Sequence, residues 1–209
     1  MSLGYTIAYR IGFTPWERAG RAGAKELSSL FEREETDRGV PFGRALDLGC
    51  GTGAHTIELA GRGWQATGID MVPRAVQMAR QRAAAAGAGN GVRFIRGDVT
   101  ALEASEAGTG FSFLLDVGCF HGLSDSQRTA MARGVSAVAS KDATLLLLAF
   151  QPGRRGPLPR GASRADIMTA FTGWAVVADE AADTSGMPGP LKNAAPRWYR
   201  LSRAGGAPS

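Results

Sequence analysis

Residues 45–53 read ALDLGCGTG, and this short stretch decides the fold of the chain. Its first four residues are apolar except for Asp47, and they predict a buried β-strand. The turn that follows carries glycine at alternate positions, namely Gly49, Gly51 and Gly53. Glycine permits a tight turn and lets a ligand lie close against the backbone. The stretch therefore predicts a strand, a ligand-binding turn and a helix over residues 56–61.

Strand and helix patterns continue to alternate after this stretch. Four further strands are predicted at residues 65–69, 92–96, 111–117 and 144–150. Pro73 suits the first turn of a helix that runs to about residue 86. Ser124 and Gln127 form a capping box for a helix to about residue 139. Strands that alternate with helices predict a parallel sheet with helices on both faces.

The two ends of the chain are less regular. A helix is expected at residues 24–35, and a loop at residues 151–162 leads to a short helix that Ser163 caps. Strands follow at residues 174–178 and 198–201, separated by a loop at 184–196. We predict a single structural domain, in which residues 1–43 form an N-terminal helical cap segment and residues 44–209 bind the ligand.

The composition sets limits on location and partners. The chain has 209 residues and a net charge of +5, but its arginines are scattered, so a nucleic-acid partner is not expected. No apolar stretch reaches the roughly 18 residues that a membrane span needs, and the N-terminus lacks the pattern of a secretory signal. Two cysteines make no disulfide framework, and no cluster has metal-ligand spacing. A cytoplasmic protein without a metal is predicted, and the sequence sets no oligomeric state.

Three acidic residues indicate the kind of ligand. Asp70 ends the second predicted strand, where a carboxylate can accept hydrogen bonds from both ribose hydroxyls. Asp98 follows the third strand, where it suits an adenine amino group. Asp47 stands just before the glycines, where it would repel a pyrophosphate but suits the positive sulfonium and ammonium groups of S-adenosylmethionine. We therefore predict S-adenosylmethionine as the cofactor and S-adenosylhomocysteine as its product.

Four segments resemble the successive motifs of class I S-adenosylmethionine-dependent methyltransferases. They are residues 47–53, Gly68-Ile69-Asp70, Gly97-Asp98-Val99 and Phe113-Leu114-Leu115-Asp116, in the family's order within residues 44–150. The resemblance implies a Rossmann-like α/β fold in three layers, α/β/α, with a seven-stranded, mostly parallel sheet whose last strand is antiparallel. It also implies the residues that contact the cofactor: Asp47, Gly49, Gly51, Gly53, Asp70, Met71, Asp98, Val99, Asp116 and Val117.

A narrower resemblance concerns the methyl acceptor. Residues 116–123, the early Pro15-Trp16 and residues 198–203 resemble the thiopurine S-methyltransferase-like and heterocyclic-toxin methyltransferase groups. These groups act on small aromatic thiols, amines or hydroxyls, so the resemblance implies a small aromatic or heterocyclic acceptor. It also implies that Trp16 helps to cover the cofactor. The thiopurine group has arginine where this chain has Val117, so a mechanism that uses the arginine is not expected here.

Methyl transfer requires mainly the alignment of nucleophile, methyl group and sulfur, and a base only if the nucleophile arrives protonated. His121 follows the fourth predicted strand and is the candidate base, because the usual pKa of histidine is near 6.5; a packed histidine is the alternative. Asp116 is expected to shape the loop or contact the cofactor, and His55 to be structural or adjacent to the cofactor. Cys50 and Cys119 follow strands that should be neighbours and are expected to be buried thiols.

Two other functions stay open at this point. An NAD(P)-dependent oxidoreductase would also place glycines after its first strand. A non-catalytic protein on the same scaffold would bind S-adenosylmethionine without turnover. In an enzyme, the substrate pocket would be built from the N-terminal segment, the loop after Phe120 and the loops at residues 151–162 and 184–196.

Overall fold

The computed structural model describes residues 23–203 except 37, 105, 154–158 and 188. The side chains of residues 103, 104, 189 and 190 are likewise not described. Trp16, the predicted cover of the cofactor, lies outside the described residues.

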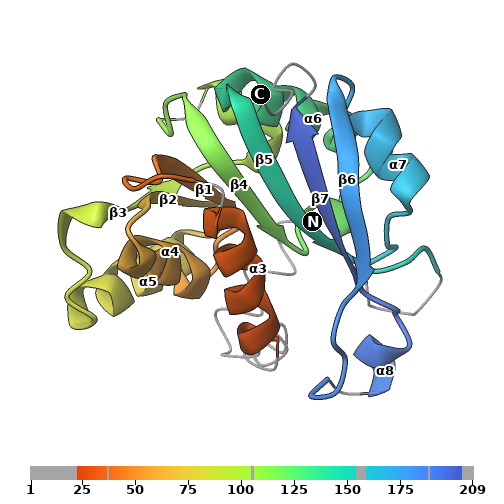
Figure 1. Cartoon of the computed structure of the whole chain (residues 1–209), viewed down its shortest axis with the longest axis horizontal. Coiled ribbons are helices and arrows are strands. Elements are labelled where there is room, and N and C mark those ends of the chain that lie inside the picture. The colour runs from red at the N-terminus through yellow and green to blue at the C-terminus, as the bar shows by residue number, and fades with distance from the viewer. Residues whose placement is uncertain (1–22, 37, 105, 154–158, 188, 204–209) are drawn as a thin grey trace.

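A seven-stranded sheet forms the centre of the molecule (Figure 1). Its strands are β1 Arg44–Leu48, β2 Gln65–Asp70, β3 Val92–Arg96, β4 Phe111–Val117, β5 Ala139–Ala149, β6 Trp174–Ala181 and β7 Arg197–Arg203. They lie in the order β3-β2-β1-β4-β5-β7-β6. Strand β7 pairs antiparallel with both β5 and β6, and the pairs among β1 to β5 are parallel. The predicted sheet, with an antiparallel last strand, is confirmed.

Helices cover both faces of the sheet. Successive strand residues point to opposite sides, so a strand that is apolar throughout has two apolar faces to bury. Helices α3 Ala24–Thr36 and α4 Ala54–Arg62 pack with Ala45, Phe113 and Leu146 in one apolar cluster. Helices α6 Asp125–Val138 and α7 Arg164–Ala170 pack with Leu46 and Leu114 in the cluster on the other face. Helix α5 Pro73–Ala85 packs against Phe94 of β3. The remaining helices are short: α8 Gly189–Lys192 and the 3₁₀ turns η1 Gly89–Gly91, η2 Val99–Ala104 and η3 Phe120–Gly122.

The predicted boundaries hold to within two residues except at β5 and β6. Strand β5 begins at Ala139, directly after α6, and not at residue 144 as predicted. A bulge explains the difference: Phe111 pairs with Ala139 but Phe113 pairs with Thr144, so the residues between lie outside the regular register. Those residues are mainly polar. The strand was predicted from a run of apolar residues, so the prediction left them out. Strand β6 continues to Ala181, three residues beyond its predicted end.

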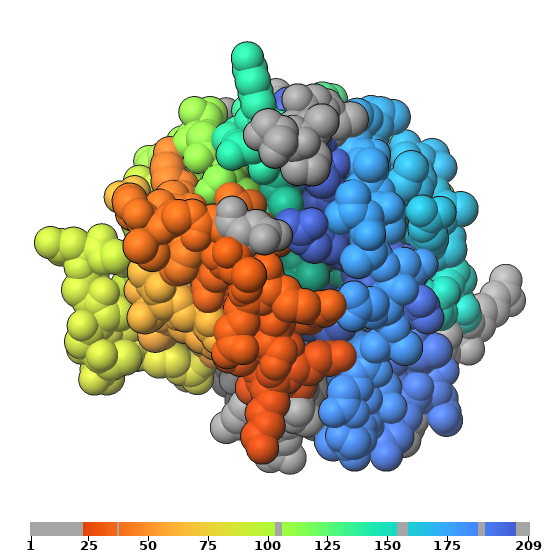
Figure 2. Space-filling view, viewed as in Figure 1, coloured from red at the N-terminus to blue at the C-terminus, as the bar shows by residue number. Residues whose placement is uncertain are grey.

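Charged side chains link helix α3 to strands β6 and β7. The buried carboxylate of Glu34 binds Arg38 at 2.6 Å and Arg200 of β7 at 2.8 Å, and it accepts a hydrogen bond from Thr144. At the surface, Arg33 and Glu180 of β6 form a two-pronged ion pair. Figure 2 shows the red-orange side chains of α3 against the blue of β6. A small groove of about 220 Å³ lies between them, lined by Leu30, Arg33, Glu34, Leu146, Ala178, Glu180, Trp198 and Arg200.

Candidate cofactor and acceptor site

Three glycines in the turn after β1 adopt a left-handed backbone conformation. Gly49, Gly51 and Gly53 have φ of 71°, 53° and 79°, values that favour glycine. A Cβ on Gly53 would lie 2.6 Å from the ring of Phe94, and one on Gly49 would lie 3.3 Å from Cys119. The N–H groups of Gly49 and Cys50 both donate to the carbonyl of Ile69. The turn therefore presents bare backbone at the carboxyl ends of β1 and β2.

Asp47 is buried beneath this turn. It is 2% exposed, and its carboxylate accepts a hydrogen bond from the hydroxyl of Thr56, the third residue of α4, at 2.6 Å. The pKa of Asp47 is raised to about 7, mainly by burial and to a smaller extent by the nearby charge of Asp70, while the hydrogen bonds from Thr56 oppose the rise. Sequence reasoning missed Thr56, although its position nine residues after Asp47, at the start of the helix, was an available signal.

Asp70 is the last residue of β2, and its side chain is hydrogen-bonded to the glycine turn that follows β1. Its two oxygens accept hydrogen bonds from the backbone N–H groups of Gly51, at 2.9 Å, and Val72, at 2.8 Å. Burial raises the pKa of Asp70, and the two N–H groups oppose that rise. Met71 follows with a 39% exposed side chain, so an apolar surface lies next to the carboxylate.

Asp98 lies after β3 at the surface. Its carboxylate accepts hydrogen bonds from the N–H and the hydroxyl of Thr100, at 2.9 and 2.8 Å, and Val99 beside it is buried. A groove of about 520 Å³ begins at Asp98 and runs along the edge strand. Its lining residues are Arg80, Ile95, Arg96, Gly97, Asp98, Ala101 and Glu106, none of which belongs to the glycine turn.

Asp116 shapes the turn that follows β4. It is fully buried and accepts hydrogen bonds from the N–H groups of Cys119, at 2.6 Å, and Phe120, at 2.9 Å. Burial raises its pKa to about 7 against the effect of those N–H groups. Val117, next to it, is half-buried. The contacts of Asp116 are those of a residue that orders a loop.

Strand order brings the four aspartates to one edge of the sheet. Asp98, Asp70, Asp47 and Asp116 belong to β3, β2, β1 and β4 or to their ends, and these strands are consecutive neighbours. Among the described residues, no arginine or lysine forms an ion pair with Asp47, Asp70 or Asp116. A buried carboxylate without a cationic partner is costly, so this edge suits a ligand that carries positive charge.

His121 lies in η3, just beyond Asp116. Its ring is buried, stacks on the ring of Phe150 with centroids 4.4 Å apart, and accepts a hydrogen bond at Nδ1 from the Phe150 N–H at 3.0 Å. Burial and the charge of Arg128 lower the pKa of His121 to about 3. An imidazole with that pKa is too weak a base to take a proton from an acceptor near neutral pH, so the predicted base role gains no support from this geometry.

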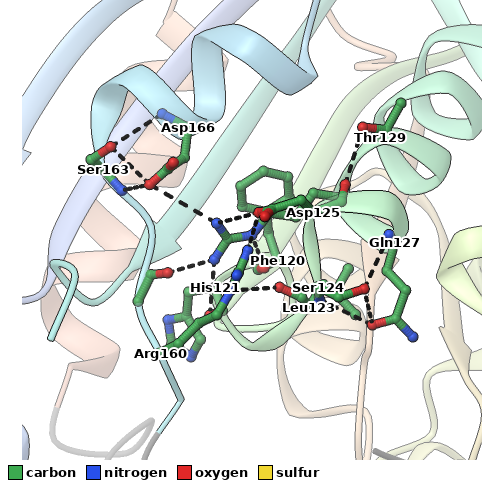
Figure 3. A network of polar contacts seen from close by, with 12 residues as sticks. Phe120, His121, Leu123, Ser124, Asp125, Gln127, Thr129, Arg160, Ser163 and Asp166 are labelled. Atoms are coloured by element: carbon green, nitrogen blue, oxygen red, sulfur yellow. Dashed lines mark hydrogen bonds and ion pairs between the residues drawn. The ribbon is translucent and has the colours of Figure 1, made fainter. Parts of the chain in front are cut away.

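Arg128, which sequence reasoning missed, organises the loop around His121. It projects from α6 and is 3% exposed, and its guanidinium donates to the carbonyls of Phe120, His121 and Gly161. Arg160 donates to the carbonyl of Leu123 and to Asp125 (Figure 3). An arginine on the buried face of an amphipathic helix was the only signal of this role in the sequence.

The two cysteines are free thiols, Cys50 buried and Cys119 half-buried. Burial raises the pKa of both well above the ordinary value, so neither is a thiolate at neutral pH. His55 lies in the first turn of α4, and burial lowers its pKa. In the part of the chain that the structure describes, no group of three or more His, Cys, Asp or Glu side chains could hold a metal ion. No helix in the same part is long and apolar enough to cross a membrane.

The chain is similar to known methyltransferases over its central part. A family profile described as a methyltransferase domain matches residues 45–142. A 2-heptyl-1-hydroxyquinolin-4(1H)-one methyltransferase of Mycobacteroides abscessus is 31% identical over 128 residues, which are 59% of this chain and 55% of that protein. The chain therefore spans little more than half the length of this relative.

Solved structures share the fold. Magnesium protoporphyrin IX methyltransferase from Synechocystis, with bound S-adenosylmethionine, has a TM-score of 0.69 at 20% identity, covering 90% of this chain and 82% of that one. The N-methyltransferase NodS from Bradyrhizobium japonicum, in complex with S-adenosylhomocysteine, has a TM-score of 0.68 at 19% identity and covers 87% of each chain.

Proposed function

We propose that the chain is a class I S-adenosylmethionine-dependent methyltransferase that moves a methyl group to an O, N or S atom of a small aromatic or heterocyclic molecule. The observation that carries this proposal is the row of buried carboxylates, Asp47, Asp70 and Asp116, none of which has a cationic partner among the described residues. A ligand with a sulfonium and an ammonium group would supply the missing positive charge.

The residues around the glycine turn fit such a cofactor. Asp70 would hold the ribose hydroxyls, Asp98 the adenine amino group, and the buried Val99 and the exposed Met71 would contact the adenine ring. The left-handed glycines leave room for the amino-acid end of the ligand against the backbone. When bound, the cofactor supplies a methyl carbon that is already activated by its bond to a positive sulfur.

The work left to the protein is then mainly alignment and exclusion of water. Rigid placement of nucleophile and methyl group can contribute many kcal/mol to the rate without acid or base chemistry. The ordered turn after β4, built by Asp116 and Arg128, supplies a rigid wall next to the glycine turn.

The nature of the acceptor rests on similarity and on the loops. The relative from Mycobacteroides abscessus is named for a hydroxyquinolone, a small heterocycle. We propose that residues 1–43 and the loops after β4, β5 and β6 form the acceptor pocket within one structural domain, and that nucleic acid and membranes are not partners. We also propose a cytoplasmic location, because both described cysteines are free thiols.

Binding and turnover assays test the proposal. Calorimetric titration with S-adenosylhomocysteine should show binding, and titration with NAD should not. The comparisons give no support to an NAD(P)-dependent oxidoreductase, and binding of NAD without S-adenosylhomocysteine would restore that alternative. Binding of S-adenosylhomocysteine without methylation of any thiol, phenol or heterocyclic amine would instead favour a non-catalytic protein that binds the cofactor.

A further inference from the structure

The ring nitrogens of His121 have different environments. Nδ1 accepts a hydrogen bond from the backbone N–H of Phe150 at 3.0 Å. An N–H donor can bind only a ring nitrogen that carries a lone pair, so the hydrogen of the neutral imidazole must be on Nε2. The stacking on Phe150 and the burial of the ring keep it in this orientation.

Nε2 lies at the carboxyl end of β4. A Cβ on Gly118 would stand 3.4 Å from Nε2 and 3.2 Å from Cε1, and the φ of Gly118 is 87°. This residue directly follows Val117, and the neighbouring Cys119 packs against Gly49 of the glycine turn. Among the described residues, no oxygen or nitrogen atom accepts a hydrogen bond from Nε2; the hydrogen bond of the ring is at Nδ1. The donor is thus beside the glycine turn and has no protein acceptor in that part of the chain.

The charges around His121 favour an anion. Arg128 on α6 holds the carbonyl of His121 itself, and Arg160 lies close enough to interact with Arg128. Asp125 and Asp166 reach Arg128 only at 3.8 and 3.9 Å, and Arg160 also binds Asp125. Asp116 on β4 faces the same turn, with its oxygens on two backbone N–H groups. Positive charge that disfavours an imidazolium ion also favours a negative ligand at the neutral ring.

We propose that His121 is a neutral hydrogen-bond donor that binds an ionised oxygen or sulfur of the methyl acceptor through Nε2–H, with Arg128 as its positioning residue. The preferred acceptors are then acidic hydroxyl or thiol groups on small aromatic rings. Such an acceptor loses its proton to water before it binds, so His121 keeps its own hydrogen throughout. One lone pair of the heteroatom accepts from Nε2–H while another remains in line with the methyl group. This inference rests on the proposed function, because it places the acceptor beside the glycine turn.

Nuclear magnetic resonance of the ring nitrogens tests the tautomer without any need for turnover. In ¹⁵N-labelled protein, His121 should show the Nε2–H tautomer and no titration between pH 5.5 and 9. His121→Asn identifies its signals against those of His55. An Nδ1–H tautomer, or titration of His121 near its usual pKa, would overturn the inference whether or not the protein is a methyltransferase.

Two matched variants separate the donor from the bond to Phe150. His121→Gln places an amide N–H near the position of Nε2 but cannot readily accept from Phe150. His121→Asn places a carbonyl oxygen near the position of Nδ1, but its shorter side chain has no donor at the position of Nε2. The probe is 4-nitrothiophenolate, whose binding to the complex with S-adenosylhomocysteine is followed by its absorbance. His121→Asn should weaken binding by roughly 10-fold or more, and His121→Gln should stay within a few-fold of the parent.

Aniline, which is neutral at pH 7, is the matched control ligand. His121→Asn should weaken its binding much less than it weakens the binding of 4-nitrothiophenolate. Equal losses for aniline and 4-nitrothiophenolate, a larger loss in His121→Gln than in His121→Asn, or no binding of the thiolate to the parent complex would each overturn the inference. Failure to bind S-adenosylhomocysteine would overturn the proposed function instead, and the tautomer would still be decided by the resonance experiment.

Discussion

The carboxylate of Asp70 accepts a hydrogen bond from the backbone N–H of Gly51 at 2.9 Å, so the end of β2 holds the turn that follows β1. Gly51 is 19 residues away in sequence, and parallel pairing of the two strands brings the groups together. A residue predicted to bind ribose therefore also orders the turn in the protein alone.

Asp70→Ala should weaken the binding of S-adenosylhomocysteine by about 1–3 kcal/mol, because it removes a carboxylate acceptor and leaves the Gly51 N–H without its partner. Calorimetric titration measures the change. Asp70→Asn is the control, since its amide oxygen can still accept from Gly51 while the charge is lost. Unchanged affinity in Asp70→Ala would show that this carboxylate does not contact the ribose.

Cofactor binding should depend on pH through Asp47. Its pKa of about 7 means that the carboxyl group is largely protonated at pH 5.5 and becomes ionised toward pH 7.5. A sulfonium favours the ionised form, so affinity for S-adenosylmethionine should fall as pH falls. S-adenosylhomocysteine has a neutral sulfur, and its α-amino group titrates like that of S-adenosylmethionine. The useful quantity is therefore the affinity for S-adenosylmethionine divided by the affinity for S-adenosylhomocysteine.

That ratio should rise on the order of 10-fold between pH 5.5 and 7.5 in the parent protein. In Asp47→Asn, which can still accept from Thr56, the rise should be distinctly smaller. Calorimetry at both pH values decides the matter. A ratio that does not change with pH in the parent would mean that Asp47 is already ionised at pH 5.5, or is too far from the sulfur to matter.

Gly53→Ala should destabilise the fold by about 3 kcal/mol, because the new Cβ would lie 2.6 Å from the Phe94 ring and the φ of 79° is unfavourable for alanine. Gly87→Ala separates the two effects. Gly87 also has a positive φ, of 63°, but nothing lies within 4 Å of a Cβ there, so a loss of only about 1 kcal/mol is expected. Urea unfolding measures the free energy of unfolding of both variants. Equal losses of stability would mean that the contact with Phe94 does not contribute to the effect of Gly53→Ala.

Glu34→Ala should lower the free energy of unfolding by about 2–4 kcal/mol. The substitution leaves Arg38 and Arg200 without a buried carboxylate between them, and Arg38 is itself mostly shielded from water. Glu180→Ala breaks the exposed pair with Arg33 and should cost less than about 1 kcal/mol. Chemical denaturation compares the two variants. A larger effect at Glu180 would contradict the view that Glu34 fastens α3 to β7.

The sequence by itself determined the sheet, its helices and the cofactor edge. Apolar strands of four to seven residues with helical patterns between them admit few arrangements other than a doubly wound parallel sheet. In such a sheet the strand ends meet at one edge, so Asp47, Asp70 and Asp98 could be assigned to one site from their places in the pattern.

Only the tertiary structure decided the state of His121 and the role of Arg128. The tautomer of the ring depends on Phe150, 29 residues away, and its pKa depends on burial and on a charge from α6. The bulge at the start of β5 likewise follows from pairing with Phe111. Local patterns record which residues are apolar, but the environment of a single polar group is set by elements distant in sequence, and its protonation follows from that environment.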